Sequence, residues 1–150
     1  MDKFDKRILM ELQVNAKQNT KEIASKIGLS VTPTYERVRK LERKGIIKSY
    51  VALLDRSKIE KEVIAYCQIT LSKHQKNALD RFEQKMKSFP EVMECHHVSG
   101  NFDFLLKIVA SSIQDFHEFA TEKLSVDDGI GTIHSVFVMK SSKDTSVFEL

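Results

Sequence analysis

Proline, glycine and cysteine are scarce in this chain, and it contains no long apolar run. Two prolines and five glycines in 150 residues, with 41% hydrophobic and 30% charged residues, are typical of a folded protein and argue against a disordered or collagen-like one. No apolar stretch reaches the roughly 18 residues that a membrane span needs, and the first residues do not resemble a signal peptide. We therefore expect a cytoplasmic protein with no membrane partner.

The two cysteines do not indicate a metal site or a disulfide. Cys67 and Cys95 lack ligand-type spacing and lie in alternating apolar stretches, so we expect reduced, buried side chains. His96 and His97 follow Cys95 in a predicted strand, where neighbouring side chains point to opposite faces. No nucleophile or further ligand motif accompanies them. We predict no catalytic residue, no cofactor and no metal, with metal binding at His96 or His97 as the alternative to core or interface histidines.

Positive charge is concentrated in the first part of the chain. Residues 1–60 hold 14 Lys and Arg against 8 Asp and Glu, which gives +6, whereas residues 61–150 hold 10 against 13, which gives −3; together these make the net charge of +3. A polyanion partner for the first part would explain the difference, because Lys and Arg that neutralise phosphates release condensed counterions. A solvated basic face is the alternative.

The first part of the chain has a helix-turn-helix pattern. Thr20 is a good N-cap for a short second helix, and Gly28 ends that helix by permitting a left-handed turn. Thr32 is placed as the N-cap of a third helix, with Pro33 at its first helical position, and Gly45 ends it. The three helices are expected over residues 2–14, 20–27 and 32–44.

The third helix predicts the surface that reads double-stranded DNA. Hydroxyl and cationic side chains on its outward side suit phosphates and base edges in a major groove, and the start of the second helix helps to fix the backbone. A solvated helix with a Glu36–Lys40 pair is the alternative. The predicted DNA-binding residues are Thr20, Lys21, Ser30, Thr32, Thr34, Tyr35, Arg37, Arg39 and Lys40.

The rest of the chain changes from helical to alternating periodicity. A short β segment over residues 46–54 and a turn over 55–58 lead to a domain boundary near residue 60. Residues 61–150 then show two β-α-β units, which predict a ferredoxin-like βαββαβ domain with two helices on one sheet face. We therefore expect an α+β chain, with a winged helix-turn-helix domain over 1–60 and a ferredoxin-like domain over 61–150.

The second sheet face is too apolar to stay in contact with water, whichever set of residues faces the helices. A partner subunit is the simplest cover, so we expect a homodimer, with higher assembly possible. An enzyme, an interaction module and an RNA-binding sheet are the alternatives. The second domain is net acidic and lacks the stacking motif of RNA-reading sheets, which argues against an RNA partner.

Two segments resemble the leucine-responsive regulatory protein and asparagine-regulator (Lrp/AsnC) family of prokaryotic transcription factors. The run GLSVTPTYERVRKLERKGII (residues 28–47) is similar to that family's recognition helix and following turn, and VSGNFDFLLK (residues 98–107) is similar to its effector-loop motif of Gly, two residues, then Asp. The resemblance implies a sequence-specific DNA-binding regulator associated with the nucleoid. It also implies dimers that assemble into octamers and an amino-acid effector, bound between dimers, that modulates assembly and DNA binding.

The family motif places the effector at a loop whose chemistry suits an amino acid. Backbone N–H groups around Gly100 and Asn101 can hold a carboxylate, and Asp103 can meet an ammonium group. A tight hairpin, in which the same residues only supply the turn, is the alternative. Ile133 and Ser135 stand where many relatives have two threonines, and Asn101 stands where an acidic residue is frequent, so leucine is not implied as the effector. The predicted effector-binding residues are Gly100, Asn101, Phe102, Asp103, Ile133 and Ser135.

Overall fold

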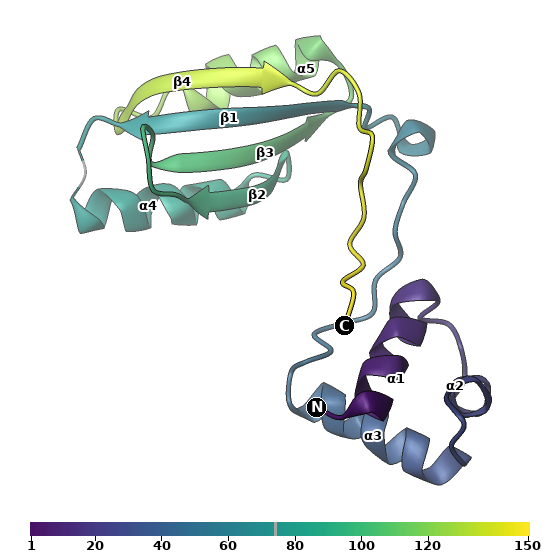
Figure 1. Ribbon diagram of the computed structural model, residues 1–150. Coiled ribbons are helices and arrows are strands. Elements are labelled where there is room, and N and C mark those ends of the chain that lie inside the picture. Colours follow the sequence, from purple (N-terminus) through teal and green to yellow (C-terminus); the bar gives the residue numbers. More distant parts are fainter. Residues whose placement is uncertain (74) are drawn as a thin grey trace. The chain divides into compact units, whose positions relative to one another are not determined.

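The structure of the chain, a computed structural model, describes residues 1–73 and 75–150 (Figure 1). It divides into two units, one formed by Met1–Leu53 with Lys143–Leu150 and the other by Leu54–Ser142. The first unit therefore ends a few residues before the predicted boundary near residue 60. It also includes the C-terminal tail, which the sequence pattern does not predict.

The first unit contains three helices whose apolar faces meet in one buried cluster. None of the helices in the described ranges is long and apolar enough to span a membrane. Ile8, Ile23, Ile27 and Leu41 form the cluster, and half-buried apolar side chains, most of them leucines, pack around it. The helices are α1 (Lys3–Val14), α2 (Thr20–Ile27) and α3 (Val31–Arg43).

Two helix starts differ from the prediction. Helix α2 is capped by Asn19, not Thr20: Asn19 Oδ1 accepts a hydrogen bond from Glu22 N at 3.0 Å, and Glu22 Oε2 accepts one from Asn19 N at 2.9 Å. This reciprocal capping box gives two backbone N–H groups a hydrogen-bond acceptor. Thr20 is instead the first residue of the helix. Helix α3 begins after Ser30, so Thr32 is a helical residue rather than the cap, because Pro33 is tolerated anywhere in a first turn whose N–H groups have no partner.

The segment that follows α3 is not a strand. Residues 46–54 carry no β structure within the part of the chain that is described, although their pattern predicts it. A lone strand leaves its backbone groups unpaired, and the first unit offers no second strand. The predicted turn over residues 55–58 is a short 3₁₀ helix, Arg56–Ile59, which Asp55 caps.

The second unit is a four-stranded antiparallel sheet with helices on one face (Figure 1). The strand order β2-β3-β1-β4 with two β-α-β units confirms the predicted ferredoxin-like domain. The elements are β1 (Val63–Leu71), α4 (Lys76–Ser88), β2 (Val92–His97), β3 (Phe104–Ala110), α5 (Ile113–Glu118), the π-helical turn η2 (Phe119–Leu124) and β4 (Ile130–Phe137).

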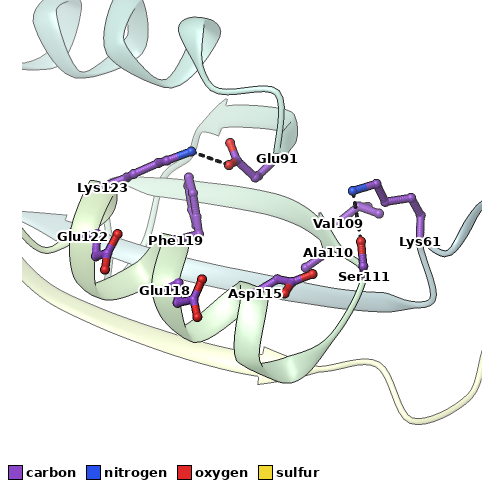
Figure 2. A pocket seen from close by; sticks show the side chains of 10 residues that line it. All are labelled: Lys61, Glu91, Val109, Ala110, Ser111, Asp115, Glu118, Phe119, Glu122 and Lys123. Carbon is purple, nitrogen blue, oxygen red and sulfur yellow. Dashed lines mark hydrogen bonds and ion pairs between the residues drawn. The ribbon is translucent and has the colours of Figure 1, made fainter.

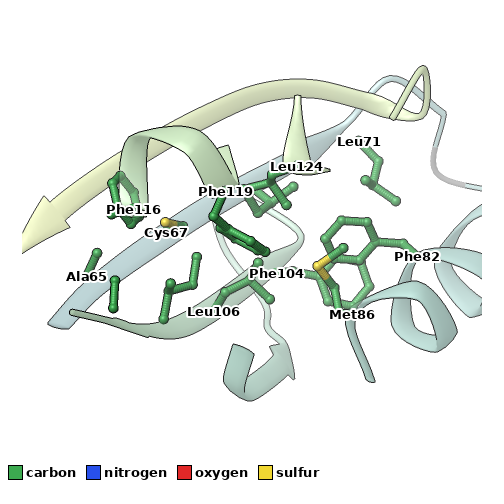
Figure 3. Close-up of a cluster of buried hydrophobic side chains, with 13 residues drawn as sticks. Ala65, Cys67, Leu71, Phe82, Met86, Phe104, Leu106, Phe116, Phe119 and Leu124 are labelled. Atoms are coloured by element: carbon green, nitrogen blue, oxygen red, sulfur yellow. The ribbon is translucent and has the colours of Figure 1, made fainter. Parts of the chain in front are cut away.

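The register shows which sheet face the helices cover. Cys67 pairs with Leu106 and Ser135, and Ile69 pairs with Phe104 and Ile133, so these residues lie on one face. This face is buried against α4, α5 and η2, as Figure 3 shows for its central side chains. Core members from the strands and helices are Ala65, Cys67, Ile69, Leu71, Phe82, Met86, Phe104, Leu106, Ile108, Ala110, Phe116, Phe119 and Leu124.

The last helix of the second unit runs from α5 into the π-helical turn η2 and turns one side to the core. The helical pattern that starts at Ile113 predicts that Phe116, Ala120 and Leu124 face inward. Phe119, three residues after Phe116, lies on the same side: it is 3% exposed and contacts Phe89 edge-on with ring centroids 5.5 Å apart. Ile113, at the start of this pattern, is exposed.

Candidate functional sites

Helix α3 is held in place by both other helices of the first unit. Ala24 of α2 is buried, and Gly28 has a φ of 73°, a left-handed conformation that turns the chain from α2 into α3. Arg7 of α1 donates hydrogen bonds to the last carbonyls of α2, at 3.0 Å to Ile27 and 2.8 Å to Lys26. A cation at a helix C-terminus also complements the helix dipole. These contacts fix α2 on α1 and direct the chain from α2 into α3.

One side of α3 is exposed and cationic. Arg39 and Lys40 are exposed there together with Tyr35, and the helical period places Arg43 on the same side. The guanidinium of Arg39 lies 3.0 Å from Glu42 Oε2, but this exposed pair contributes little and can exchange for a phosphate. The predicted DNA-binding residues that share the exposed side are Ser30, Thr32, Tyr35, Arg39 and Lys40.

Two predicted DNA-binding residues of α3 do not point outward. Thr34 has 0% exposure, and its Oγ1 donates a hydrogen bond to the Ser30 carbonyl at 2.9 Å, so its predicted outward position is wrong. Arg37 turns toward α1, where its Nη1 lies 2.7 Å from both Asp2 Oδ2 and Asp5 Oδ1. Both residues lie on the same helical side as the buried Leu41, which explains their inward direction.

The start of α2 lies at the surface. Thr20 is half-buried as the first helical residue, and Lys21 after it is exposed. The α2 N-terminus carries a partial positive charge, so an exposed lysine there is well placed to meet a phosphate.

A tyrosine ties the segment after α3 back to that helix. The Tyr50 hydroxyl donates a hydrogen bond to Glu42 Oε1 at 3.0 Å. Burial, followed by the hydrogen bond and the negative charge of Glu42, raises the pKa of Tyr50 to about 12. The hydroxyl therefore stays a neutral donor at physiological pH and keeps the segment against the end of α3.

The predicted effector loop is the connection between β2 and β3. Val98 N donates to Asp103 O at 2.9 Å, and Gly100 has a φ of 132°, which side-chain-bearing residues rarely adopt. The carboxylate of Asp103 accepts a hydrogen bond from Leu71 N at 2.7 Å, beside the irregularity at the end of β1. The loop is thus a rigid turn, and Asp103 has a role in its structure.

The structure does not bring all the predicted effector residues together. Ile133 packs against the core, and the Ser135 hydroxyl lies 3.2 Å from Cys67 Sγ, both on the helix-covered face. Strand β1 lies between β4 and the Gly100–Asp103 loop. Of the predicted effector-binding residues, therefore, only those of the Gly100–Asp103 loop lie together within one chain.

Sequence comparison places both halves of the chain in one family. Residues 64–148 match the Lrp/AsnC ligand binding domain, and residues 1–48 match a winged helix-turn-helix DNA-binding domain. The chain belongs to the Lrp/AsnC family. The leucine-responsive regulatory protein of Rhizobium meliloti (strain 1021) is 36% identical over 151 aligned positions, which cover 100% of this chain and 96% of that one. The protein of the same name from Escherichia coli (strain K12) is 33% identical, covering 97% and 89%.

Solved structures of regulators have the same fold. An AsnC family transcriptional regulator from Agrobacterium tumefaciens superimposes with a TM-score of 0.94 at 34% identity, covering 99% of this chain and 96% of that one. A transcriptional regulator from Neisseria meningitidis, solved as an L-Met complex, gives a TM-score of 0.93 at 29% identity, covering 97% and 94%. This Lrp/AsnC chain is therefore a DNA-binding transcription regulator with a ligand-binding domain, and not an enzyme.

The ligand-binding domain of this Lrp/AsnC protein also has a cavity of about 290 Å³ (Figure 2). Neither of the two family motifs in the sequence points to it. It contains none of the residues 100–103, 133 or 135. Lys123 lies 2.6 Å from Glu91 Oε1, and Glu91 Oε2 is buried without a hydrogen-bond partner among the described residues. Burial opposes ionisation of Glu91, but the hydrogen bond and charge of Lys123 and the charge of Lys61 hold its pKa below the usual value. The lining residues, from distant segments, are Lys61, Glu91, Val109, Ala110, Ser111, Asp115, Glu118, Phe119, Glu122 and Lys123.

Cys67, Cys95, His96 and His97 make packing or polar contacts within the second unit. Cys67 is buried and Cys95 half-buried, both as free thiols. His97 stacks on Phe104 with ring centroids 5.0 Å apart, and His96 lies 3.2 Å from Glu94. Across the described ranges, no three His, Cys, Asp or Glu side chains are grouped as metal ligands.

Proposed function

We propose that the exposed side of α3 docks in the major groove of double-stranded DNA. The observation that carries this assignment is a cationic helix face, with Arg39 and Lys40 exposed, on a helix whose opposite side is buried. Tyr35, Thr32 and Ser30 complete the surface that meets bases and phosphates. Thr20 and Lys21, at the start of α2, contact the backbone.

The double substitution of Arg39 and Lys40 by alanine tests this docking mode. Each lost phosphate contact reduces the slope of log K against log salt by about 0.9, so we expect weaker binding and a slope that is flatter by about one to two. A fluorescein-labelled duplex, selected by the wild-type chain from a random pool, is titrated at several salt concentrations.

A charge-matched control separates contact from general attraction. Lys76 and Lys87 are exposed lysines of α4 in the second unit, and their double alanine variant removes the same charge. We expect its salt slope to stay near that of the wild type. Equal slope losses in the two double variants would refute the assignment to α3.

We also propose that the Gly100–Asp103 loop binds the carboxylate and ammonium groups of an amino acid. The L-Met complex of the Neisseria relative supports an amino-acid ligand for this chain, and the fixed turn at Gly100 presents backbone N–H groups to a carboxylate. The residue beside it, Asn101, is exposed and Phe102 is half-buried. Ile133 and Ser135 stay outside this proposal because of their contacts with the core.

A thermal-shift series with the twenty amino acids tests the loop. A ligand that binds only the native state raises the melting temperature. Asp103→Ala removes the hydrogen bond to Leu71 N as well, so Asn101→Ala, a change at an exposed side chain of the same loop, is the second variant. A ligand-induced shift that both variants preserve in full would refute the loop as the site.

We infer that the uncovered sheet face joins two copies of the chain, which assemble further into octamers, and that the effector shifts this assembly. The face carries apolar side chains between polar ones, with Tyr66 and Leu105 half-buried and Val136 exposed. Assembly changes how many DNA-binding units engage one duplex, at the nucleoid in the cytoplasm. Light scattering with and without the bound amino acid tests this, and a single mass in every condition argues against it.

A further inference from the structure

Arg37 is the one cation of α3 whose charge is already matched by two carboxylates within the described chain. Its Nη1 lies 2.7 Å from Asp2 Oδ2 and 2.7 Å from Asp5 Oδ1, and its guanidinium lies over the Phe4 ring at 5.6 Å from the centroid. The side chain is 30% exposed. The two carboxylates offset the positive charge of the guanidinium, so a phosphate gains less from a contact with Arg37 than from one with an exposed cation of the same helix.

The two acids are fixed by the start of α1. Asp2 Oδ1 accepts hydrogen bonds from Phe4 N at 2.8 Å and Asp5 N at 3.0 Å, and Asp5 Oδ2 accepts one from Asp2 N at 3.1 Å. This capping box orients both carboxylates independently of their contacts with Arg37. Asp5 is only 8% exposed. The hydrogen bonds from the backbone and from Arg37 lower the pKa of Asp2, so this partner stays ionised at neutral pH.

This network adds a directional constraint to the apolar contacts between α3 and α1. The core contacts of α3 with α1, made through Leu41 and its neighbours, depend on area and have little directional preference. Hydrogen bonds from one guanidinium to two fixed carboxylates are directional and set both the rotation and the position of α3 on α1. Major-groove recognition depends on that placement, because side chains must reach base edges in register.

We propose that Arg37 is a positioning residue: held by Asp2 and Asp5, it fixes the orientation of α3 on α1 and leaves the contacts with DNA to the exposed cations of the helix. This inference rests on the DNA-binding function of the unit. It removes Arg37 from the predicted DNA-binding residues and gives the acidic N-terminal residues a part in recognition.

Asp5→Asn in the full chain tests the proposal by the sign of its effect. The variant removes one negative charge, so electrostatic attraction alone predicts tighter binding to DNA. If Arg37 were released to contact DNA, binding would be tighter and its salt slope steeper. A positioning role predicts the opposite. We expect binding to the duplex selected by the wild-type chain to weaken by about tenfold, the size of a lost hydrogen bond to a charged group, with an unchanged salt slope and weaker discrimination against a scrambled duplex.

Two controls make the result specific. Arg7→Ala also breaks a tie of α1, to the end of α2 rather than to α3, so it lowers the melting temperature while keeping the discrimination between duplexes. Arg39→Ala keeps the Arg37 network and flattens the salt slope by about 0.9. All binding is measured at a temperature where circular dichroism shows each variant to be folded. Asp2→Asn, at a more exposed partner, gives the same measurement if Asp5→Asn does not fold.

The outcomes are decisive in either direction. Weaker binding of Asp5→Asn at unchanged slope, with reduced discrimination, supports positioning. Tighter binding, a steeper slope or wild-type discrimination overturns it. Failure of the wild-type chain to bind any selected duplex would instead refute DNA binding by this unit, which is a different result.

Discussion

Replacing Ile8 by alanine should lower the melting temperature of the DNA-binding unit without destabilising the rest of the chain. Ile8 has 0% exposure and lies in the centre of the small cluster that joins α1, α2 and α3. Removing a buried isoleucine side chain costs about 2–5 kcal/mol, because transfer energy is lost and a cavity remains.

The size of the unit makes this loss large in proportion. A unit of about 60 residues has a free energy of unfolding of roughly 3–9 kcal/mol. The second unit has its own core, which contains none of the first unit's residues. We therefore expect the transition of the first unit to fall by at least roughly 10 °C while that of the second unit stays in place.

Scanning calorimetry, combined with DNA binding measured across the same temperatures, follows the two units separately. The variant should lose DNA binding at the lowered transition, and an amino-acid ligand should still raise the upper one. Val14→Ala, a change of similar chemistry at a 76% exposed position of the same helix, is the control and should shift neither transition by much. If Ile8→Ala lowers one common transition for the whole chain, the two cores are not independent and the reasoning is wrong.

Three further predictions follow from single contacts. Gln13→Ala should release the C-terminal tail, because the Gln13 amide donates to Phe148 O at 3.0 Å and accepts from Phe148 N at 2.7 Å; faster hydrogen exchange at the Phe148 amide would show it. The pKa of Asp5 is lowered from 3.8, although burial opposes this, by hydrogen bonds from Asp2 N and Arg37. Its stabilising effect should therefore be full above about pH 4 and disappear as pH falls through the lowered pKa, a dependence that melting curves should find reduced in Asp5→Asn. Burial raises the pKa of the Cys67 thiol, so iodoacetamide should modify it only after unfolding, as peptide mass mapping can establish.

The sequence allowed both folds to be predicted because their signals are local and repeated. The stripes of apolar residues in α1 and α2 and the Gly28 turn predict the helix-turn-helix, and two β-α-β patterns predict the ferredoxin-like domain. Helix starts were harder to place, since Asn19 and Thr20 are both good caps and only the reciprocal bond with Glu22 decides between them. The π-helical turn over Phe119–Leu124 has no signal in a 3.6-residue period.

Features that depend on distant pairs could not be predicted in this way. The docking of the C-terminal tail joins Gln13 to Phe148, and the cavity beside Glu91 collects side chains from several elements. The strand predicted after α3 failed for a related reason, because a strand exists only if a partner pairs with it. In each case the feature depends on a contact between residues far apart in the chain, and the spacing of residues along the sequence does not reveal such a contact.

The same distinction applies to the charges of the recognition helix. Arg37 and Arg39 are two residues apart and identical in chemistry, so a charge count treats them alike. Arg39 is exposed and has one acidic partner, Glu42, three residues along its own helix, which a phosphate can displace. Arg37 has two partners at the start of another helix, one of them buried, and losing Arg37 would leave that carboxylate without this cation. A cation on a DNA-binding helix is therefore a candidate contact only after its own ion pairs are known, and here that test separates the proposed DNA contact, Arg39, from the proposed positioning residue, Arg37.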